Sequence, residues 1–202
     1  DFDGLIQAVV DSGPSALRES STVTKITTDS WEMLREGIIS ADMMEKAARP
    51  MNILFVCTGN SCRSPMAEVI FKSMLAKKLG VSIAELPVQG FEVNSAGVAA
   101  FDGSRASENA VLAMKAAGLE LSDHYSRHLT DEMVHEADLI LAMSGSHLYH
   151  INEIDPSNQK AFLISENGVG DPIGGSLDMY LSCARYIERA LRSEWLERIF
   201  SQ

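Results

Sequence analysis

The chain has 202 residues, of which 46% are hydrophobic and 22% charged, as is ordinary for a soluble globular protein. No apolar run approaches the roughly 20 residues that a membrane-spanning helix needs, and no signal peptide opens the sequence, so we expect a cytoplasmic protein with no membrane partner. The formal net charge of −11 disfavours nucleic acid as a partner, because its phosphates would be repelled. The first residue is Asp1 rather than Met, as in a processed or shortened chain.

Taken in chain order, the predicted elements favour an α/β fold. Residues 1–50 form an N-terminal appendage that ends in a short linker at 47–50, and the apolar run Met51–Val56 is typical of a buried parallel strand. The elements expected after this strand are a helix at 65–79, a strand at 91–94, a helix at 107–117, strands at 137–143 and 161–164, and a final helix at 177–200. This alternation implies one domain, residues 51–202, with a parallel sheet covered on both faces.

A Cys-x5-Arg motif stands at the carboxyl end of the first strand, where ligands of parallel sheets bind. Cys57–Pro65 reads Cys-Thr-Gly-Asn-Ser-Cys-Arg-Ser-Pro and lacks the Gly-Lys-Ser/Thr ending of a Walker loop. A loop that wraps into a helix start points several backbone N–H groups at one spot, where the helix dipole favours negative charge. Phosphate fits such a cradle, and Arg63 can bind two of its oxygens.

The same field makes Cys57 the candidate nucleophile, because it favours the thiolate over the thiol. Ser64 could donate a hydrogen bond to the sulfur. A structural cysteine at a strand end is the alternative, but the strand, the motif and the following helix together favour a catalytic cysteine.

A proton donor for the leaving group is also needed. Asp171 lies at the centre of the glycine-rich loop 168–176 and is the candidate, although Asp-Pro alone is typical of a turn.

Residues 51–202 resemble the low-molecular-weight protein phosphatase family along their whole length. The matching segments are Val56–Glu68, Asn94–Gly97, Asp123–Arg127, Ala137–Met143 and Asp171–Pro172. The resemblance implies a four-stranded parallel sheet with helices on both faces and a phosphate loop after the first strand. It also implies that Cys57 takes the phosphoryl group, that Arg63 binds it, and that Asp171 serves as acid and then as base while water hydrolyses the phosphocysteine.

By the same resemblance, no metal or other cofactor is needed, and the phosphate-binding loop consists of Thr58, Gly59, Asn60, Ser61, Cys62 and Ser64. Asn60 and Ser95 are expected to brace this loop by hydrogen bonding. His124 and His128 lie four residues apart but lack a metal-binding pattern, so a surface or packing role is favoured for them.

Two features bear on the phosphorylated protein substrate. At Ser61, tyrosine-directed members of the family usually carry an apolar residue and arginine-directed members a small hydroxyl residue. After Asp171, tyrosine enzymes usually present aromatic side chains, whereas the run Ile173–Tyr180 resembles the bacterial arginine phosphatases. A guanidinium gains from polar surroundings and a phenol ring from aromatic walls. We therefore favour phosphoarginine, with protein tyrosine phosphatase as the alternative.

Other interpretations are weaker. Arsenate reduction on this scaffold needs two further cysteines close together, and the distant Cys183 has no such neighbour. A module that only binds phosphorylated partners would not need the full set of nucleophile, arginine and acid. Cys62 could form a reversible disulfide with Cys57, or be a small buried residue. The sequence does not indicate an oligomeric state.

The segments Val9–Pro14, Ser20–Thr24 and Leu34–Ile39 resemble the end of the threonylcarbamoyl-AMP synthase domain, which acts in tRNA modification. Residues 1–50 would then be the remnant of a fused synthase-like domain. They could not perform that chemistry alone, and we expect them to pack as a β-hairpin on the phosphatase or on a neighbouring copy.

Overall fold

The computed structural model describes residues 19–28 and 30–201. The chain divides into two compact units, Asp1–Arg49 and Pro50–Gln202. The segment Val9–Pro14, which carried part of the synthase resemblance, lies outside the described residues.

The first unit contains a hairpin and a helix. Strands β1 (Val23–Ile26) and β2 (Trp31–Arg35) pair antiparallel. Helix α1 (Ala41–Ala48) follows, and the Ser40 hydroxyl at its start accepts a hydrogen bond from the N–H of Met43. The expected linker at 47–50 is therefore wrong in its first half, because a capped helix extends through residue 48 before Pro50 prevents its continuation.

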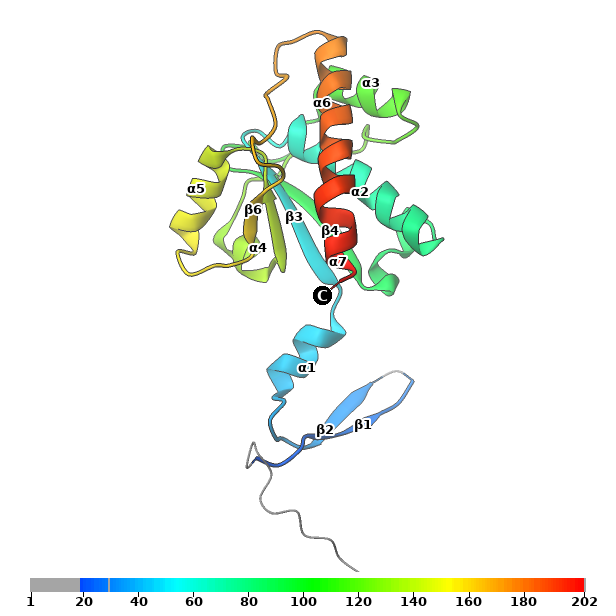
Figure 1. Cartoon of the computed structure of the whole chain (residues 1–202), viewed down its shortest axis with the longest axis vertical. Helices are drawn as coiled ribbons and strands as arrows, with labels where there is room; N and C mark the ends of the chain where they lie inside the picture. Colours follow the sequence, from blue (N-terminus) through cyan, green and yellow to red (C-terminus); the bar gives the residue numbers. More distant parts are fainter. Residues whose placement is uncertain (1–18, 29, 202) are drawn as a thin grey trace, which may run out of the picture. The chain divides into compact units, whose positions relative to one another are not determined.

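The second unit is built on a parallel sheet of four strands in the order β4-β3-β5-β6 (Figure 1). The strands are β3 (Met51–Cys57), β4 (Phe91–Gly97), β5 (Leu139–Ala142) and β6 (Ala161–Leu163). All neighbouring pairs are parallel, so the carboxyl ends of the strands meet at one edge. This confirms the predicted four-stranded parallel sheet.

Helices cover both faces of this sheet (Figure 1). They are α2 (Arg63–Leu79), α3 (Glu108–Ala116), α4 (Asp131–Glu136), α5 (Gly145–Ile154), α6 (Leu177–Ala190) and α7 (Leu196–Ile199), with 3₁₀ turns at Ile83–Glu85 and Pro87–Gln89. One hydrophobic cluster joins the sheet to α2, α3, α6 and α7, and a second joins it to α4 and α5.

Strand β3 shows why its sequence is apolar without alternation. Successive side chains of a strand point to opposite faces. Ile53 and Phe55 are buried in the cluster with α2 and α6, whereas Leu54 and Val56 are buried in the cluster with α4 and α5. The strand therefore carries Cys57 to the carboxyl edge between two packed helical layers.

The expected single helix at 177–200 is interrupted. Helix α6 ends at Ala190, and a π-helical turn, Leu191–Trp195, precedes α7. A π turn accommodates an extra residue. Trp195 is buried at this turn, and its indole Nε1 donates a hydrogen bond to the carbonyl of Ile164 at 2.8 Å.

Candidate active site

The thiol of Cys57 lies at the carboxyl end of β3, enclosed by the loop that leads into α2. Only 2% of the residue is exposed. The N–H of Asn60 donates a hydrogen bond to the sulfur at 3.3 Å, and the Ser64 hydroxyl lies 3.0 Å from it. The sulfur therefore has two polar partners beside the amino end of α2, where the helix dipole is positive. This is an environment in which a negative charge is stabilised.

Asn60 is the centre of the loop's internal bonding. Its φ of 50° lies in the left-handed region, which asparagine tolerates better than most residues. The side-chain amide is fully buried; it donates to the hydroxyls of Ser64 at 2.9 Å and Ser95 at 2.8 Å. Its oxygen accepts from the N–H of Arg127 at 2.8 Å. The structure thus brings together Asn60, in the loop after β3, and Ser95, on β4.

Two residues that sequence reasoning missed extend this network. The Ser95 hydroxyl donates to the carboxylate of Glu68 at 2.6 Å, and Glu68 also pairs with Lys72 at 2.6 Å. His124 Nε2 lies 2.9 Å from the carbonyl oxygen of Asn60. Because a carbonyl only accepts, this nitrogen carries the proton. Burial lowers the pKa of His124, which favours the neutral ring in this role.

Arg63 is 5% exposed and joins the phosphate loop to the loop of Asp171. Its Nη1 donates to the carbonyl of Val169 at 3.3 Å. Its Nη2 donates to the Thr58 hydroxyl at 3.3 Å and to the Asp171 carboxylate at 2.5 Å. The Asp171 side chain is 40% exposed, so the carboxylate is accessible from the surface. The structure therefore gathers thiol, guanidinium and carboxylate at one edge of the sheet.

At two glycines the backbone of one segment lies so close to another that a larger residue would not fit, and these contacts position the phosphate loop and the loop of Asp171. A Cβ atom on Gly97 would come within 2.5 Å of the Thr58 carbonyl oxygen, so β4 can pack against the phosphate loop only with glycine there. Gly168 has a φ of +66°, and a Cβ atom on it would lie 2.7 Å from the carbonyl oxygen of Met143. Glycine at 168 thus lets the Asp171 loop begin directly against the end of β5.

The remaining predicted loop residues form its outer rim. Thr58 is exposed, and Gly59 and Ser61 are half-buried. The carbonyl of Ser61 accepts the N–H of Ser107 at 2.9 Å, which ties the loop to the start of α3. The Ser61 hydroxyl lies 3.6 Å from the sulfur of Cys62.

All three cysteines are free thiols, and the other two are placed differently from Cys57. Cys62 is 4% exposed; its sulfur lies 3.2 Å from the Ser107 hydroxyl and 3.4 Å from the Tyr180 hydroxyl. Burial raises the pKa of Tyr180, and the contact with Cys62 raises it further. Burial also raises the pKa of Cys183 to about 12, so this cysteine remains a thiol at neutral pH.

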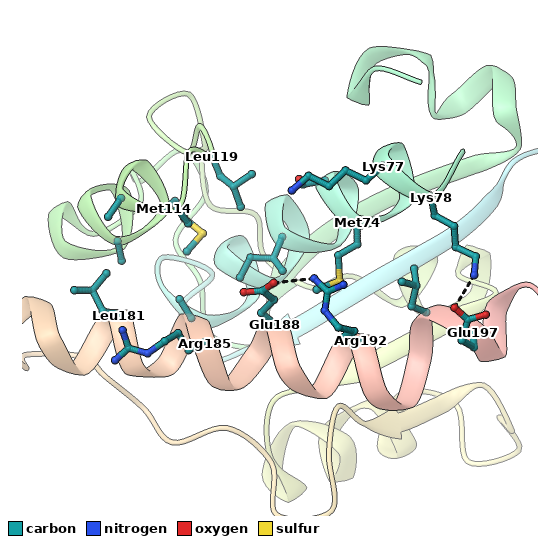
Figure 2. A pocket seen from close by; sticks show the side chains of 17 residues that line it. Met74, Lys77, Lys78, Met114, Leu119, Leu181, Arg185, Glu188, Arg192 and Glu197 are labelled. Carbon is teal, nitrogen blue, oxygen red and sulfur yellow. Dashed lines mark hydrogen bonds and ion pairs between the residues drawn. The ribbon is translucent and has the colours of Figure 1, made fainter. Parts of the chain in front are cut away.

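Among the residues that the structure describes, α6 lines a hollow that touches the site and a larger one that does not. A space of about 430 Å³ lies between α6 and the loop of Asp171, which leaves that loop open on one side. A larger groove of about 530 Å³ runs between α2, α3 and α6, with an apolar floor that includes Met74 and Met114 (Figure 2). At its rim, Lys78 pairs with Glu197 at 2.6 Å, and Arg192 pairs at 2.9 Å with Glu188, one turn earlier on the same helical stretch. None of the predicted site residues lines this groove.

Across residues 19–28 and 30–201, no three His, Cys, Asp or Glu side chains gather as a metal ion would require. None of the helices described there is long and apolar enough to span a membrane.

Comparisons with known proteins agree with this geometry. Residues 52–202 match the family model described as low molecular weight phosphotyrosine protein phosphatase. A protein-arginine-phosphatase of Bacillus subtilis is 39% identical over 149 residues, which cover 70% of this chain and 93% of the relative. A probable low molecular weight protein-tyrosine-phosphatase, EpsP, of Ralstonia nicotianae is 32% identical over 151 residues, which cover 73% of this chain and 94% of the relative.

Among solved structures, the crystal structure of a YwlE mutant from Bacillus subtilis superimposes with a TM-score of 0.64 at 36% identity. The match covers 75% of this chain and 99% of that one.

Proposed function

The chain belongs to the low-molecular-weight phosphotyrosine protein phosphatase family, and from this premise we propose that Cys57, Arg63 and Asp171 hydrolyse a phosphorylated protein side chain. The observation that carries the proposal is the position of Arg63. It bonds at once to the phosphate loop, at Thr58, and to the candidate acid, Asp171. A phosphoryl group held by this guanidinium would therefore lie between the nucleophile and the acid.

In the first step the phosphoryl group binds to the loop N–H groups at the start of α2 and to Arg63. Its negative charge competes with the Asp171 carboxylate for the guanidinium and repels that carboxylate, which releases Asp171 to turn toward the leaving group. The Cys57 thiolate attacks phosphorus, and the bond from phosphorus to the leaving atom breaks. Asp171 gives that atom its proton, and the phosphocysteine remains.

In the second step water attacks the phosphocysteine. Asp171, now a carboxylate, takes a proton from the water, and the sulfur–phosphorus bond breaks to give inorganic phosphate and the thiolate. The N–H of Asn60 donates to the sulfur, and the Ser64 hydroxyl, 3.0 Å from it, can turn its proton from the Ala96 carbonyl to the sulfur, so both groups stabilise this leaving thiolate. The enzyme returns to its starting state without a metal ion or other cofactor.

For the substrate we favour phosphoarginine. The hydroxyl of Ser61 offers a polar wall on the rim of the loop, and the side chain that follows Asp171-Pro172 is Ile173, which is 68% exposed and aliphatic. The similarity to protein-arginine-phosphatases supports the same choice.

One observation favours phosphotyrosine as the second candidate. Phe101 is 84% exposed, two residues beyond Ala99, whose N–H donates to the Thr58 carbonyl at 2.9 Å. Such a ring would suit a phenol.

The test compares wild type and Ser61→Ile on a phosphoarginine peptide and a phosphotyrosine peptide. Isoleucine removes the hydroxyl and adds an apolar wall, so burying a guanidinium there costs more, whereas a phenol gains dispersion contacts. We expect kcat/KM on phosphoarginine to fall at least about tenfold, or ~1.4 kcal/mol, while activity on phosphotyrosine holds or rises. Ser61→Thr is the matched control, because it is also branched at Cβ but keeps the hydroxyl. A wild type that strongly prefers phosphotyrosine would refute the arginine assignment.

The other expectations remain proposals. Arsenate reduction is disfavoured by Cys183, since a thiol with a pKa of about 12 is a poor relay for disulfide exchange. A reversible disulfide between Cys57 and Cys62 would appear as peroxide inactivation that dithiothreitol reverses. We also propose a cytoplasmic location and a synthase-like origin for residues 1–50.

A further inference from the structure

His147 comes to the same edge as the phosphate loop although it lies 89 residues from Thr58 in the sequence. It stands in the first turn of α5, directly after β5, and is 3% exposed. Its Nε2 lies 2.9 Å from the Thr58 hydroxyl oxygen, and its Nδ1 lies 2.8 Å from the hydroxyl oxygen of Ser144. Both ring nitrogens are therefore engaged by hydroxyl groups.

The Thr58 hydroxyl has a second partner, Arg63, whose Nη2 lies 3.3 Å away. Since a guanidinium only donates, the Thr58 oxygen accepts from Arg63. A neutral imidazole has one donor and one acceptor nitrogen, and the two hydroxyls can satisfy either tautomer. Burial first, and the nearby charge of Arg63 second, lower the pKa of His147 to about 4. The neutral ring thus places no second positive charge beside the arginine.

We propose that His147 is a positioning residue for the phosphate-binding arginine, acting through the Thr58 hydroxyl. The proposal rests on the function proposed above for the phosphate loop. It concerns a histidine and a helix that the proposed catalytic steps do not use.

The hydrogen-bonded series Ser144–His147–Thr58 orients Arg63 during the catalytic cycle. In the structure, Nη2 of Arg63 donates to both the Thr58 hydroxyl and the Asp171 carboxylate. When Asp171 turns to the leaving group, this nitrogen loses its carboxylate partner. The Thr58 hydroxyl, held from behind by His147, remains to keep the guanidinium oriented toward the phosphoryl oxygens. Without His147 the hydroxyl can rotate, and the guanidinium loses a fixed acceptor.

The first measurement is the binding of inorganic phosphate by calorimetry, alongside KM and kcat for an aryl phosphate, on the full chain. We expect His147→Ala to weaken phosphate binding and raise KM about tenfold, with kcat changed less than threefold. His147→Gln can keep the bond to Thr58 and should stay within about threefold of wild type, whereas His147→Asn should resemble alanine. His150→Ala is the matched control, a histidine on the same helix whose partner is Glu153, and it should match wild type.

The second measurement is a double-mutant cycle with Thr58→Val, which removes the hydroxyl and keeps the shape. Thr58→Val alone should weaken phosphate binding about tenfold. In that background His147→Ala should change binding less than twofold, because its route to Arg63 is already absent.

Several results would overturn the proposal. The first is phosphate binding that is unchanged in His147→Ala or in Thr58→Val. The second is an equal effect of His147→Ala and His150→Ala on phosphate binding. The third is a double variant whose loss of phosphate affinity is the product of the two single losses. If His147→Ala does not fold, two results still decide. They are the phosphate affinity of His147→Gln compared with that of His147→Asn, and the phosphate affinity of Thr58→Val alone. A wild-type chain that hydrolyses no aryl phosphate would instead refute the proposed function. Hydrolysis that proceeds normally in all His147 variants would remove only the positioning role.

Discussion

Replacing Asn60 tests whether the phosphate loop is held by its buried amide. Asn60→Ala removes the hydrogen bonds to Ser64, Ser95 and the N–H of Arg127. The two serine hydroxyls keep other partners, since Ser95 still bonds to Glu68 and Ser64 to a backbone carbonyl. The N–H of Arg127 loses its acceptor and stays in a partly buried position.

The magnitude follows from these contacts. Each serine bond contributes about 1 kcal/mol, and the stranded N–H costs about 2 kcal/mol. Alanine at the φ of 50° adds about 1 kcal/mol of backbone strain. We expect Asn60→Ala to lower the free energy of unfolding by about 5 kcal/mol. Asn60→Gly loses the same bonds but tolerates the backbone, so it should be about 1 kcal/mol less destabilising. Asn60→Asp keeps the acceptor for the N–H and should recover about 2 kcal/mol.

Urea unfolding followed by circular dichroism gives these free energies, and aryl phosphate hydrolysis gives the activity. Asn60→Asp separates stability from activity, because it recovers part of the lost stability yet places a carboxylate against the Ser64 hydroxyl, which lies 3.0 Å from the Cys57 sulfur, and should abolish turnover. Asn109→Ala is the control, because it removes one hydrogen bond, to the carbonyl of Gly175, outside the phosphate loop; it should lower the free energy of unfolding by about 1 kcal/mol. A loss below about 1.5 kcal/mol for Asn60→Ala, or a glycine variant less stable than alanine, would refute the reasoning.

Three further predictions follow from the site. Cys57→Ser should abolish turnover while inorganic phosphate still raises the melting temperature; activity within tenfold of wild type would contradict the role. Asp171→Ala should slow substrates with poor leaving groups by about 10² to 10⁴, and an activated aryl phosphate less; equal losses would make Asp171 structural. His147 takes its proton more readily when unfolded, so stability should fall from pH 6.5 to about 4. His147→Gln should remove at most about 3 kcal/mol of this decrease in the free energy of unfolding. A pH dependence of unfolding that is the same in wild type and His147→Gln would contradict this.

The fold was predictable where the signal is continuous in sequence. Strand β3, the loop and the start of α2 occupy neighbouring residues, and burial on both faces gives β3 its unbroken apolar run. Helices α4 and α5 escaped prediction for a physical reason. The former has only six residues, and the apolar positions of the latter, such as Ile151, are interrupted by His147 and His150. Neither gives the periodicity of a long amphipathic helix.

The proposed nucleophile, arginine and acid could be named because a motif and a glycine-rich loop mark them. The residues that orient them could not. His124 and Arg127 bond to Asn60 from 64 and 67 residues away, and His147 reaches Thr58 from 89 residues away. No local pattern records such contacts. The usable signal for His147 was its place just after a predicted strand, since every parallel strand ends at the edge that binds the ligand.

These distant contacts fall into two groups that act on different parts of the loop. Ser95, His124 and Arg127 all bond to Asn60 and so fix the backbone around the sulfur. His147, by contrast, bonds to a side chain on the rim, and through it to Arg63. A change in the first group alters a strained, buried backbone, and its cost appears in the stability of the whole domain. A change in the second leaves that backbone in place and alters the orientation of one guanidinium, so its cost appears in phosphate affinity.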